Sequence, residues 1–380
     1  MKRRIRVLIT ISVCCVLKAF SQEVSLADLS FQSTAFIQEE DDSPVILTGG
    51  TIALRFIPVT PIELTARTAF YTQDTQKFLS SFDNSQEPAF VLFEGAALSY
   101  TALFNRTSTV TVFTGLLDNP ASPSLLRRLF KITVEPCEFH GMPAGVPFSP
   151  ETEIRGNGLA LTTIPFNTQV GAGIYTYWNG ETGSQFTLTG DLRLVLALDN
   201  AFFNFFGGSS WLYGDEKASF RGGATALVRS DSGHELYGEA GIRSISIGSD
   251  DIGKNLYFLF ESRLHTNAID SVFSFFSSPV FPSTLRNESI MEAETMFLGL
   301  NALIAWGRLP IERIRTGISF LGALNPDDPG TVTPFSFSVS PFVTCRLSDY
   351  DIQVTAVIKP LLLDDPGTAG ELRFLLKAVF

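Results

Sequence analysis

The most constraining feature of this chain is a stretch in which apolar side chains recur at every second position and charged residues stand between them. Within residues 186–199, Asp191 and Arg193 alternate with an apolar series made of Phe186, Leu188, Leu192, Leu194, Leu196 and Leu198. A period of two is that of a β-strand, so the two series lie on opposite faces. Burying Asp191 and Arg193 in a dry core would be costly. The pattern therefore predicts a sheet with one wet face and one apolar face.

Similar alternation recurs along the chain, and no repeat of 20–50 residues or linker divides it. The sequence predicts an all-β protein with one domain of about sixteen antiparallel strands, fourteen being the alternative. The expected strands are 26–38, 46–57, 61–73, 89–104, 107–117, 166–178, 184–198, 202–213, 217–229, 235–247, 255–266, 291–306, 311–323, 334–347, 350–361 and 370–380.

The N-terminal residues are typical of a secretory signal peptide. Lys2, Arg3, Arg4 and Arg6 precede an apolar run, 7–17, and Ala19-Phe20-Ser21 fits a small-x-small cleavage site. We expect cleavage near Ser21, which leaves residues 22–380 as the exported domain. After residue 22 no stretch approaches the roughly 18 apolar residues of a membrane helix, so a closed barrel is the remaining way to cross a bilayer.

The other end of the chain carries a second signature. Leu372, Phe374, Leu376 and Phe380 form an alternating apolar series that stops on the terminal phenylalanine. This series resembles the closing strand of bacterial outer-membrane β-barrels. The resemblance implies a transmembrane up-and-down barrel in the outer-membrane lipid. It also implies that these four residues are an assembly signal for the barrel-assembly machinery and periplasmic chaperones.

The predicted connections fall into a short set and a long set. An even strand number places both ends of the chain on one side, and outer-membrane barrels have short periplasmic turns and longer outer loops. The longest connection, 118–165, is rich in proline and needs a reason in a compact domain. It follows the fifth expected strand, as does the constriction loop of sixteen-stranded general porins, which it resembles in place.

Within that connection, residues 136–141 resemble the acidic turn of porin constriction loops, with an inserted cysteine and histidine. The resemblance implies that Glu138, Phe139 and His140 contribute to a constriction. The alternative is a lid that covers the mouth of the barrel. A short helix over 124–130 is expected in the same loop.

If the apolar series face lipid, the opposite positions line the pore. The candidate pore-lining residues are Arg55, Arg67, Asp191, Arg193, Glu239, Arg243, Glu261, Arg263, Arg313 and Arg315. Such charges tune ion preference, and this set predicts a weak preference for anions. The alternative is that they keep the lumen hydrated and pair with one another, as Glu261 with Arg263.

Other function classes have little support in the sequence. The chain has 39 Asp and Glu against 28 Lys and Arg, a balance that disfavours nucleic-acid partners. No nucleophile elbow, zinc-protease, phosphate-loop or dinucleotide motif stands out, so we expect no enzyme activity and no cofactor. The acidic turns near 327 and 364 favour turn formation, and no metal site is predicted. A disulfide between Cys137 and Cys345 is left open.

The sequence thus predicts a porin-like passive channel for small solutes. The alternative is a plugged barrel whose outer loops bind a ligand or a host molecule. A homotrimer would follow from analogy with porins of this size. Neither the solute nor the open or closed state of the lumen follows from the sequence.

Overall fold

The computed structural model describes most of the strand-forming part of the chain. The described residues are 23–37, 44–72, 89–103, 108–122, 125–126, 130–132, 134, 154–165, 169–179, 187–212, 218–246, 255–266, 268–278, 297–307, 313–324, 335–348, 350–362 and 369–378. Among them, no helix combines the length and apolar character that a membrane crossing requires.

The described strands form one antiparallel sheet of 18 strands in which each strand pairs with its neighbours in sequence. Their bounds are β1 Glu23–Ile37, β2 Pro44–Val59, β3 Ile62–Thr72, β4 Ala89–Leu103, β5 Ser108–Leu117, β6 Ile154–Thr163, β7 Val170–Asn179, β8 Thr187–Leu198, β9 Ala201–Leu212, β10 Ala218–Arg229, β11 Glu235–Ser246, β12 Leu256–His265, β13 Ile269–Ser278, β14 Phe297–Trp306, β15 Ile314–Leu324, β16 Phe335–Leu347, β17 Tyr350–Ile358 and β18 Gly370–Ala378.

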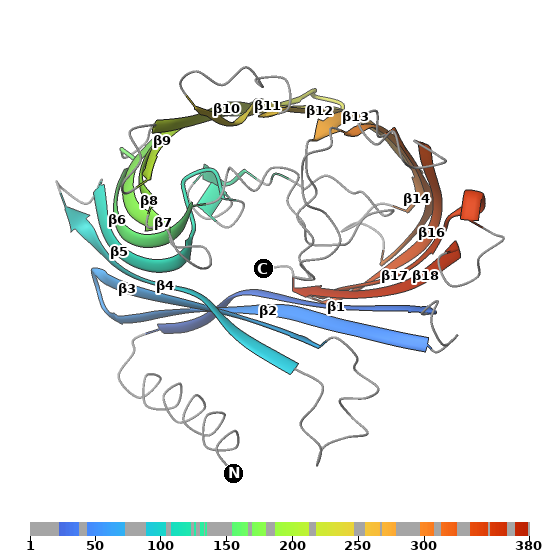
Figure 1. Cartoon of the computed structure of the whole chain (residues 1–380), viewed down its shortest axis with the longest axis horizontal. Coiled ribbons are helices and arrows are strands. Elements are labelled where there is room, and N and C mark those ends of the chain that lie inside the picture. Colours follow the sequence, from blue (N-terminus) through green and yellow to red (C-terminus); the bar gives the residue numbers. More distant parts are fainter. Residues whose placement is uncertain are drawn as a thin grey trace, which may run out of the picture.

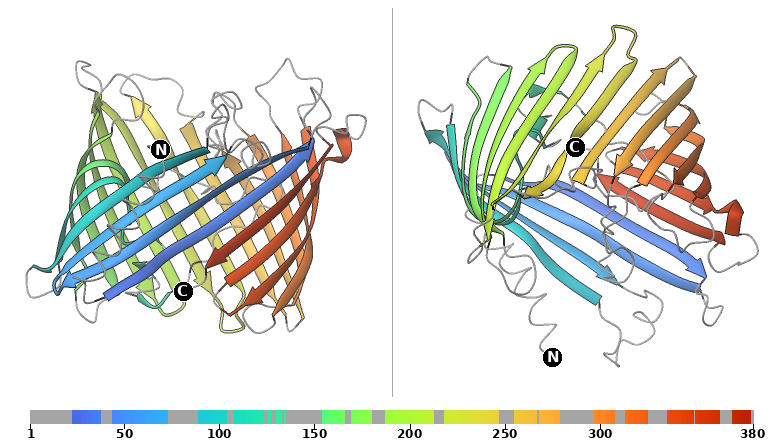
Figure 2. Two further views of the ribbon diagram at one scale, coloured as in Figure 1. Left: turned by 90° about the horizontal axis from the view of Figure 1, so that it is seen from below. Right: turned by 45° about the horizontal axis from the view of Figure 1, so that its top comes forward.

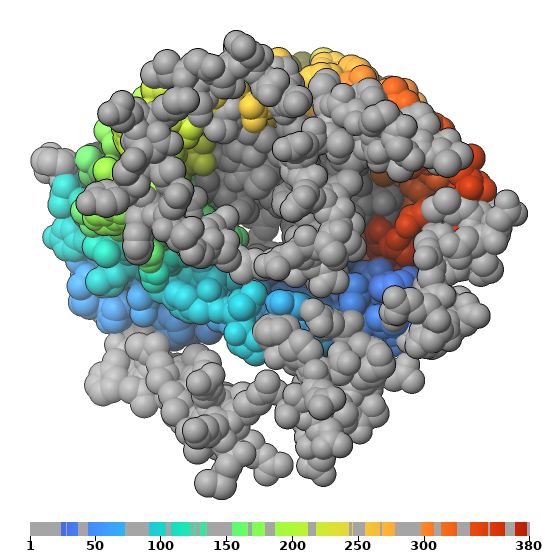
Figure 3. Space-filling model, in the orientation of Figure 1, coloured from blue at the N-terminus to red at the C-terminus, as the bar shows by residue number. Residues whose placement is uncertain are grey.

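The sheet closes on itself. β1 pairs with β18 in an antiparallel register that runs from Ser30 opposite Lys377 to Phe36 opposite Glu371. Figure 1 looks along the barrel and shows the strands as a ring, and Figure 2 shows how steeply they tilt. In the space-filling view the coloured atoms of the wall are arranged around the centre of the molecule (Figure 3). Closure leaves no unpaired edge in the sheet that the 18 described strands form, as a membrane-spanning sheet requires.

The two faces of the wall differ as the alternation predicts. On β8, Leu192 and Leu194 are 57% and 44% exposed, whereas Asp191 and Arg193 are 4% and 0% exposed. The same alternation of exposed apolar and buried positions follows β12 and β14. The large exposed side chains therefore cover the outside of the barrel, and the charged positions of these strands face inward.

Aromatic residues mark both ends of the outer surface. Trp178 and Trp211 are exposed near one end of the wall, and Trp306 and Tyr350 are exposed near the other. Aromatic girdles at both interfaces flank the apolar band of membrane barrels. This arrangement matches a wall that crosses a bilayer.

The expectation of sixteen or fourteen strands is wrong, because two strands lie inside connections that were expected to be irregular. β6 was part of the predicted loop 118–165, so that connection spans 118–153 in the structure. The glycines of β6 make it resemble a loop. A Cβ on Gly158 would lie 2.5 Å from the Cβ of Tyr177 on β7, so the neighbouring strand requires these glycines.

β13 was missed for a different reason. Its alternation of serine and aromatic residues, together with Asp270, is a weak strand signal. In the barrel its polar side chains have partners on β12, since Ser274 donates to Glu261 and Asp270 contacts His265. Those partners come from another strand, which the local sequence does not reveal.

The two missed strands change which connections share an end of the barrel. The connections 60–61, 104–107, 164–169, 199–200, 230–234, 266–268, 307–313 and 348–349 lie at what we call the short-turn end, where β1 begins and β18 ends. The opposite, long-loop end has the connections 38–43, 73–88, 118–153, 180–186, 213–217, 247–255, 279–296, 325–334 and 359–369. The difference in connection length between the two ends of the barrel is therefore larger than predicted.

Candidate functional site

The candidate site is the inner face of the barrel together with the segment that follows β5. Leu126 is 1% exposed and packs with Val195, Phe202 and Leu227. Val195 belongs to the inward series of β8, because the flanking Leu194 is exposed on the outer face. The described part of the connection 118–153 therefore lies against the inner wall, where Figure 1 shows it inside the ring.

This segment extends far into the barrel. It leaves β5 at the long-loop end and forms a tight turn that is closed by the amide of Ser122 donating to the carbonyl of Asn119. Pro120 of this turn lies beside Gly171, near the start of β7. Farther along, Ile132 lines a small cavity with Asn200 of the 199–200 turn and with Arg229, the last residue of β10. Both of those residues belong to the short-turn end. The contacts described between the segment and β8–β10 therefore lie in the short-turn half of these strands.

A first charged cluster lies on the long-loop half of the inner wall. Both carboxylate oxygens of Asp191 accept from Arg221, at 3.2 and 2.5 Å, and the hydroxyl of Tyr177 donates to the same carboxylate. Arg221 also donates to the Tyr177 hydroxyl. Arg193 Nη2 lies 3.9 Å from Asp191 Oδ2, and its guanidinium stacks 4.5 Å from the ring centre of Phe206. One carboxylate therefore serves two cations.

A second cluster, the Arg229 network, lies at the short-turn end. Arg229 Nη2 lies 2.6 Å from Glu235 Oε1, and Arg263 Nη1 lies 3.1 Å from Glu235 Oε2. Arg263 Nε is also 2.6 Å from Glu261 Oε1. Ser274 completes the chain by donating to Glu261. Two cations and two anions alternate, so the network as a whole is neutral.

Further pairs follow the same short-turn end around the barrel. Arg55 Nε lies 2.8 Å from Glu63 Oε1 across β2–β3. Arg346 Nη2 lies 2.6 Å from Asp351 Oδ2 across β16–β17. Because hydrogen-bonded opposite charges largely cancel beyond their own neighbourhood, these pairs hydrate the wall without giving it a strong sign.

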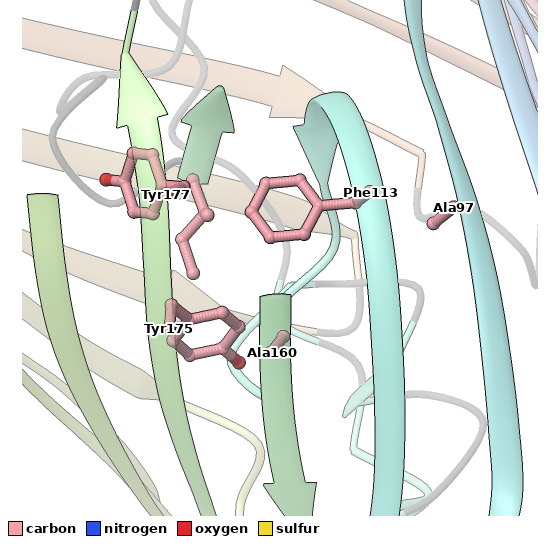
Figure 4. Close-up of a cluster of buried hydrophobic side chains, with 6 residues drawn as sticks. Ala97, Phe113, Ala160, Tyr175 and Tyr177 are labelled. Atoms are coloured by element: carbon pink, nitrogen blue, oxygen red, sulfur yellow. The ribbon is translucent and has the colours of Figure 1, made fainter. Parts of the chain in front are cut away.

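Part of the inner wall, on β4–β7, is aromatic and closely packed. Phe113, Tyr175 and Tyr177 form a buried cluster with Ala97, Ile154 and Ala160, drawn from β4–β7 (Figure 4). Tyr175 is fully buried, and the centres of the Phe113 and Tyr177 rings lie 6.0 Å apart. The wall of this channel candidate therefore alternates polar networks with flat aromatic surfaces.

The structure describes the side chains of most of the predicted pore-lining residues. Asp191 and Arg193 meet each other, as do Glu261 and Arg263. The others have different partners: Arg55 pairs with Glu63, Arg67 Nη2 is 3.7 Å from Asp118, Arg315 Nε is 3.9 Å from Asp270, and Glu239 accepts from Tyr237. Pore lining by these residues stays a prediction.

Arg313 lies outside the expected pattern, and the predicted inward position of Arg243 is not tested by the described side chains. Arg313 precedes β15 and is exposed at the short-turn end, where its carbonyl accepts from the amide of Arg346, so it belongs to the rim. At Arg243 the β10–β11 register shifts between Phe220 and Gly222, which interrupts the parity from which an inward position was predicted. The side chain of Arg243 lies outside the described part.

Several predictions concern residues outside the described ranges: the signal peptide and its cleavage site, Glu138, Phe139 and His140, Cys137 and the terminal Phe380. Within the described part, Cys345 carries a free thiol. Leu372, Phe374 and Leu376 lie on β18, next to the β1 seam. Their role as an assembly signal stays a prediction.

Sequence reasoning missed Arg221, Arg229, Glu235 and Asp270, which complete the two clusters and their neighbours. Arg221 and Arg229 share one parity on β10, so the period of two could have identified both as inward-facing residues. Asp270 was hidden because β13 was not recognised as a strand.

Comparison with known proteins gives a fold. No family model and no curated protein match the sequence. Among solved structures, the chain is similar to Acinetobacter baumannii OccAB3 (TM-score 0.55, 9% identity, 94% of this chain and 99% of that chain). It is also similar to OccK5 (OpdH) of Pseudomonas aeruginosa (0.53, 10%, 94% and 98%) and to the outer membrane protein OpdK of the same organism (0.53, 9%, 94% and 99%).

The chain has the fold of an outer-membrane β-barrel. The match covers nearly the whole length of each protein, so closure, strand direction and the single-barrel architecture are shared. At such low identity the likeness concerns the fold and carries no residue of the inner wall from one protein to the other.

Proposed function

We propose that this protein is a porin-like passive channel for small polar solutes in the bacterial outer membrane. The observation that carries the proposal is the closed barrel with an apolar outer face and an inner face bearing ion-pair networks. Lipid would cover the outside, and water with dissolved solutes would fill the space that the inner wall and the inward segment leave.

The inward segment would set the width of the passage. Leu126 anchors it in an apolar patch of the wall, so it is fixed by packing and does not depend on a ligand. No catalytic arrangement is part of the proposal, and no cofactor is needed. Outer-membrane lipid and the barrel-assembly machinery are the proposed partners, with a homotrimer as the proposed assembly.

The test is conductance of the purified, refolded protein in planar bilayers, joined to swelling of liposomes in a small sugar. We expect stepwise conductance and swelling. A Leu126→Ala variant should loosen the anchor of the segment and raise the conductance, while a Leu192→Ala variant, changed on the outer face, should leave it unchanged. A parent protein that folds but neither conducts nor swells liposomes would contradict the channel.

A second candidate is a plugged barrel whose outer loops bind a ligand. The observation that favours it is the burial of the inner wall, since Arg193, Phe276 and Leu303 are fully covered. Folded protein that does not conduct, yet retains a ligand through its loops, would support this candidate.

A further inference from the structure

We infer that the inner face of β1–β3 around Gly49 is a binding site for an uncharged sugar. The inference rests on the proposed channel function and gives it a solute class, namely neutral polyhydroxy compounds. Gln32 and Tyr71 would bind the solute directly, and the hydroxyl groups of Ser30 and Thr51 would extend the contact.

Gln32, Gly49 and Tyr71 form one row across three neighbouring strands. Gln32 of β1 is directly opposite Gly49 of β2, and Gly49 is directly opposite Tyr71 of β3. Ile52 of β2 is exposed on the outer face, so Gly49, three residues away, is on the inner face together with its two partners. Gly49 has no side chain, and neighbouring strands are about 4.8 Å apart. An amide and an aromatic ring therefore flank roughly 10 Å of wall in which this row contributes only backbone.

The surface around this row is polar but uncharged. Ser30 Oγ lies 2.8 Å from Thr51 Oγ1, and the Gln32 amide donates to Thr34 Oγ1 at 3.4 Å. The inward positions within 30–36 of β1 and 47–53 of β2 are Ser30, Gln32, Thr34, Phe36, Leu47, Gly49, Thr51 and Ala53. This uncharged surface differs from the inner face of β8–β12, where the two charged clusters lie.

Described cations on the flanking strands β18 and β3 border this surface: Arg373, Lys377 and Arg67. Arg373 Nη2 lies 2.6 Å from Glu371 Oε2, and its charge is offset there. Arg67 Nη2 lies 3.7 Å from Asp118 Oδ1. Lys377 is exposed, so a solute recognised by negative charge would depend on Lys377.

Hydroxyl and amide groups suit a sugar because each of them both donates and accepts hydrogen bonds, as every sugar hydroxyl does. A guanidinium only donates and a carboxylate only accepts, and in the charged clusters these groups bind one another, as Asp191 and Arg221 do. Tyr71 adds a ring on which the C–H face of a sugar can pack. An apolar surface with a few placed polar groups is typical of small-molecule sites.

The site is accessible without any movement of the inward segment. Gln32, Tyr71, Ser30 and Thr51 are partly exposed, whereas Arg193 on the inner face of β8 is fully buried. β1 and β10 are nine positions apart in the ring of 18 strands, and the contacts described for the inward segment lie on β7–β10. Figure 1 shows β1 and β2 across the ring from β10 and β11.

The experiment measures glucose binding in two ways. Planar bilayers give the glucose concentration that produces half of the maximal reduction in KCl current, and saturation-transfer NMR detects glucose on the refolded protein in detergent micelles. Gln32→Leu and Tyr71→Leu should each raise the half-maximal concentration about threefold to tenfold, because each removes a hydrogen-bonding group or the ring surface. Gly49→Val, which places a side chain between the two, should weaken binding at least as much.

Gln353→Leu is the matched control. Gln353 is in the same register row, on the far side of Leu375 from Gln32, and the substitution is the same amide-to-apolar change. It should change the half-maximal concentration less than about twofold. An effect equal to that of Gln32→Leu would contradict a site centred on Gly49.

The charge of the solute is tested separately. Binding of an uncharged sugar should be the same in 0.1 M and 1 M KCl and in Lys377→Gln, because salt screens only interactions between charges. Gluconate, an anion of similar size, serves as the comparison. Gluconate binding tighter than glucose binding that is lost in Lys377→Gln would overturn the neutral solute class.

The remaining outcomes separate the inference from the channel once heat-modifiable gel migration shows folded protein. A parent that does not conduct overturns the channel, and glucose binding by NMR then still tests the site. A parent that conducts but shows no glucose effect in either measurement overturns the inference alone. If Gln32→Leu does not fold, Tyr71→Leu and Gly49→Val decide the question against the same control.

Discussion

Several glycines on the inner face of the barrel lie beneath aromatic rings, whereas Gly190, Gly207 and Gly238 on the outer face have room for a Cβ. A Cβ on Gly299 would lie 2.1 Å from the ring of Phe276, and one on Gly317 would lie 2.8 Å from the ring of Phe342. On the outer face, a Cβ on Gly190 or Gly238 would meet its nearest neighbour at 4.0 Å. The space beside these glycines is therefore occupied differently on the two faces. Side chains of the protein fill it on the inner face, and lipid is expected to fill it on the outer face.

The same contrast applies to charge. Inward charges are buried but share hydrogen-bonded partners, as Asp191 does with Arg221. The outer face of the spanning strands is covered by exposed leucine, valine and phenylalanine. A substitution should thus be costly inside when it breaks a network, and costly outside when it introduces a charge.

The largest effect is expected from Asp191→Asn. Two neighbouring guanidinium groups would lose their common carboxylate, and breaking a buried ion pair typically costs about 3–5 kcal/mol. We expect a large drop in the free energy of unfolding, measured by guanidinium titration in lipid vesicles. Asp199→Asn, at an exposed turn, is the matched control and should change stability by less than about 0.5 kcal/mol. Equal stability of the two variants would show that the inward charge network around Asp191 does not stabilise the barrel.

The next largest effect is expected from Leu192→Arg on the outer face. Leu192 lies in the middle of β8 and is 57% exposed, and an arginine facing lipid at the bilayer midplane costs roughly 2–4 kcal/mol. Leu198→Arg, at the end of the same strand, should cost only about 0–1 kcal/mol because it lies near the interface. The same titration in vesicles measures both, and a penalty that does not depend on depth would argue against a lipid-facing surface.

A smaller effect is expected from Gly299→Ala on the inner face. The added methyl group must displace the ring of Phe276, and such overpacking typically costs about 1–3 kcal/mol. Gly238→Ala makes the same chemical change on the outer face and should stay within about 0.5 kcal/mol of the parent. If the two alanine variants unfold at the same denaturant concentration, adding a methyl group costs the same stability on both faces, which contradicts this comparison.

The smallest effect is expected near the β1–β18 seam, where a glycine on the outer face also packs beneath aromatic rings. At the seam, Gly50 lies between Phe31 and Phe70, and a Cβ there would be 2.7 Å from the Phe70 ring. Phe31 lies 6.2 Å from both Phe70 and Phe374, so Phe31→Ala should lose about 0.5–1.5 kcal/mol of aromatic contact beyond its apolar burial.

Because the β1–β18 seam closes the barrel, this loss should lower the temperature at which the barrel unfolds, which is measured as the temperature at which its gel mobility changes. Phe275→Ala removes a comparable pair with Phe258, at 5.1 Å, away from the seam. We expect a larger shift for Phe31→Ala than for Phe275→Ala. A larger shift for Phe275→Ala would show that aromatic contacts at the seam do not contribute more to barrel stability than a similar pair elsewhere.

The sequence by itself determined the face on which each strand residue lies. Period two is a local property of the extended backbone, so Asp191 and Arg193 could be placed inward, and Leu192 and Leu194 outward, before any strand was paired. The closed barrel was expected from the resemblance of the C-terminal strand to outer-membrane barrels and from the lack of a membrane helix in the sequence, because a sheet that faces lipid must leave no edge. Both expectations hold in the structure.

Tertiary structure alone decided the strand number and the partners of the charges. β6 and β13 are strands because Tyr177 fills the space above Gly158 and because Glu261 accepts from Ser274, contacts between strands that no local pattern contains. The balance around Glu235 likewise depends on Arg229 and Arg263, which reach it from β10 and β12. Pairing and register are set by neighbours across the sheet, and a single strand cannot specify them.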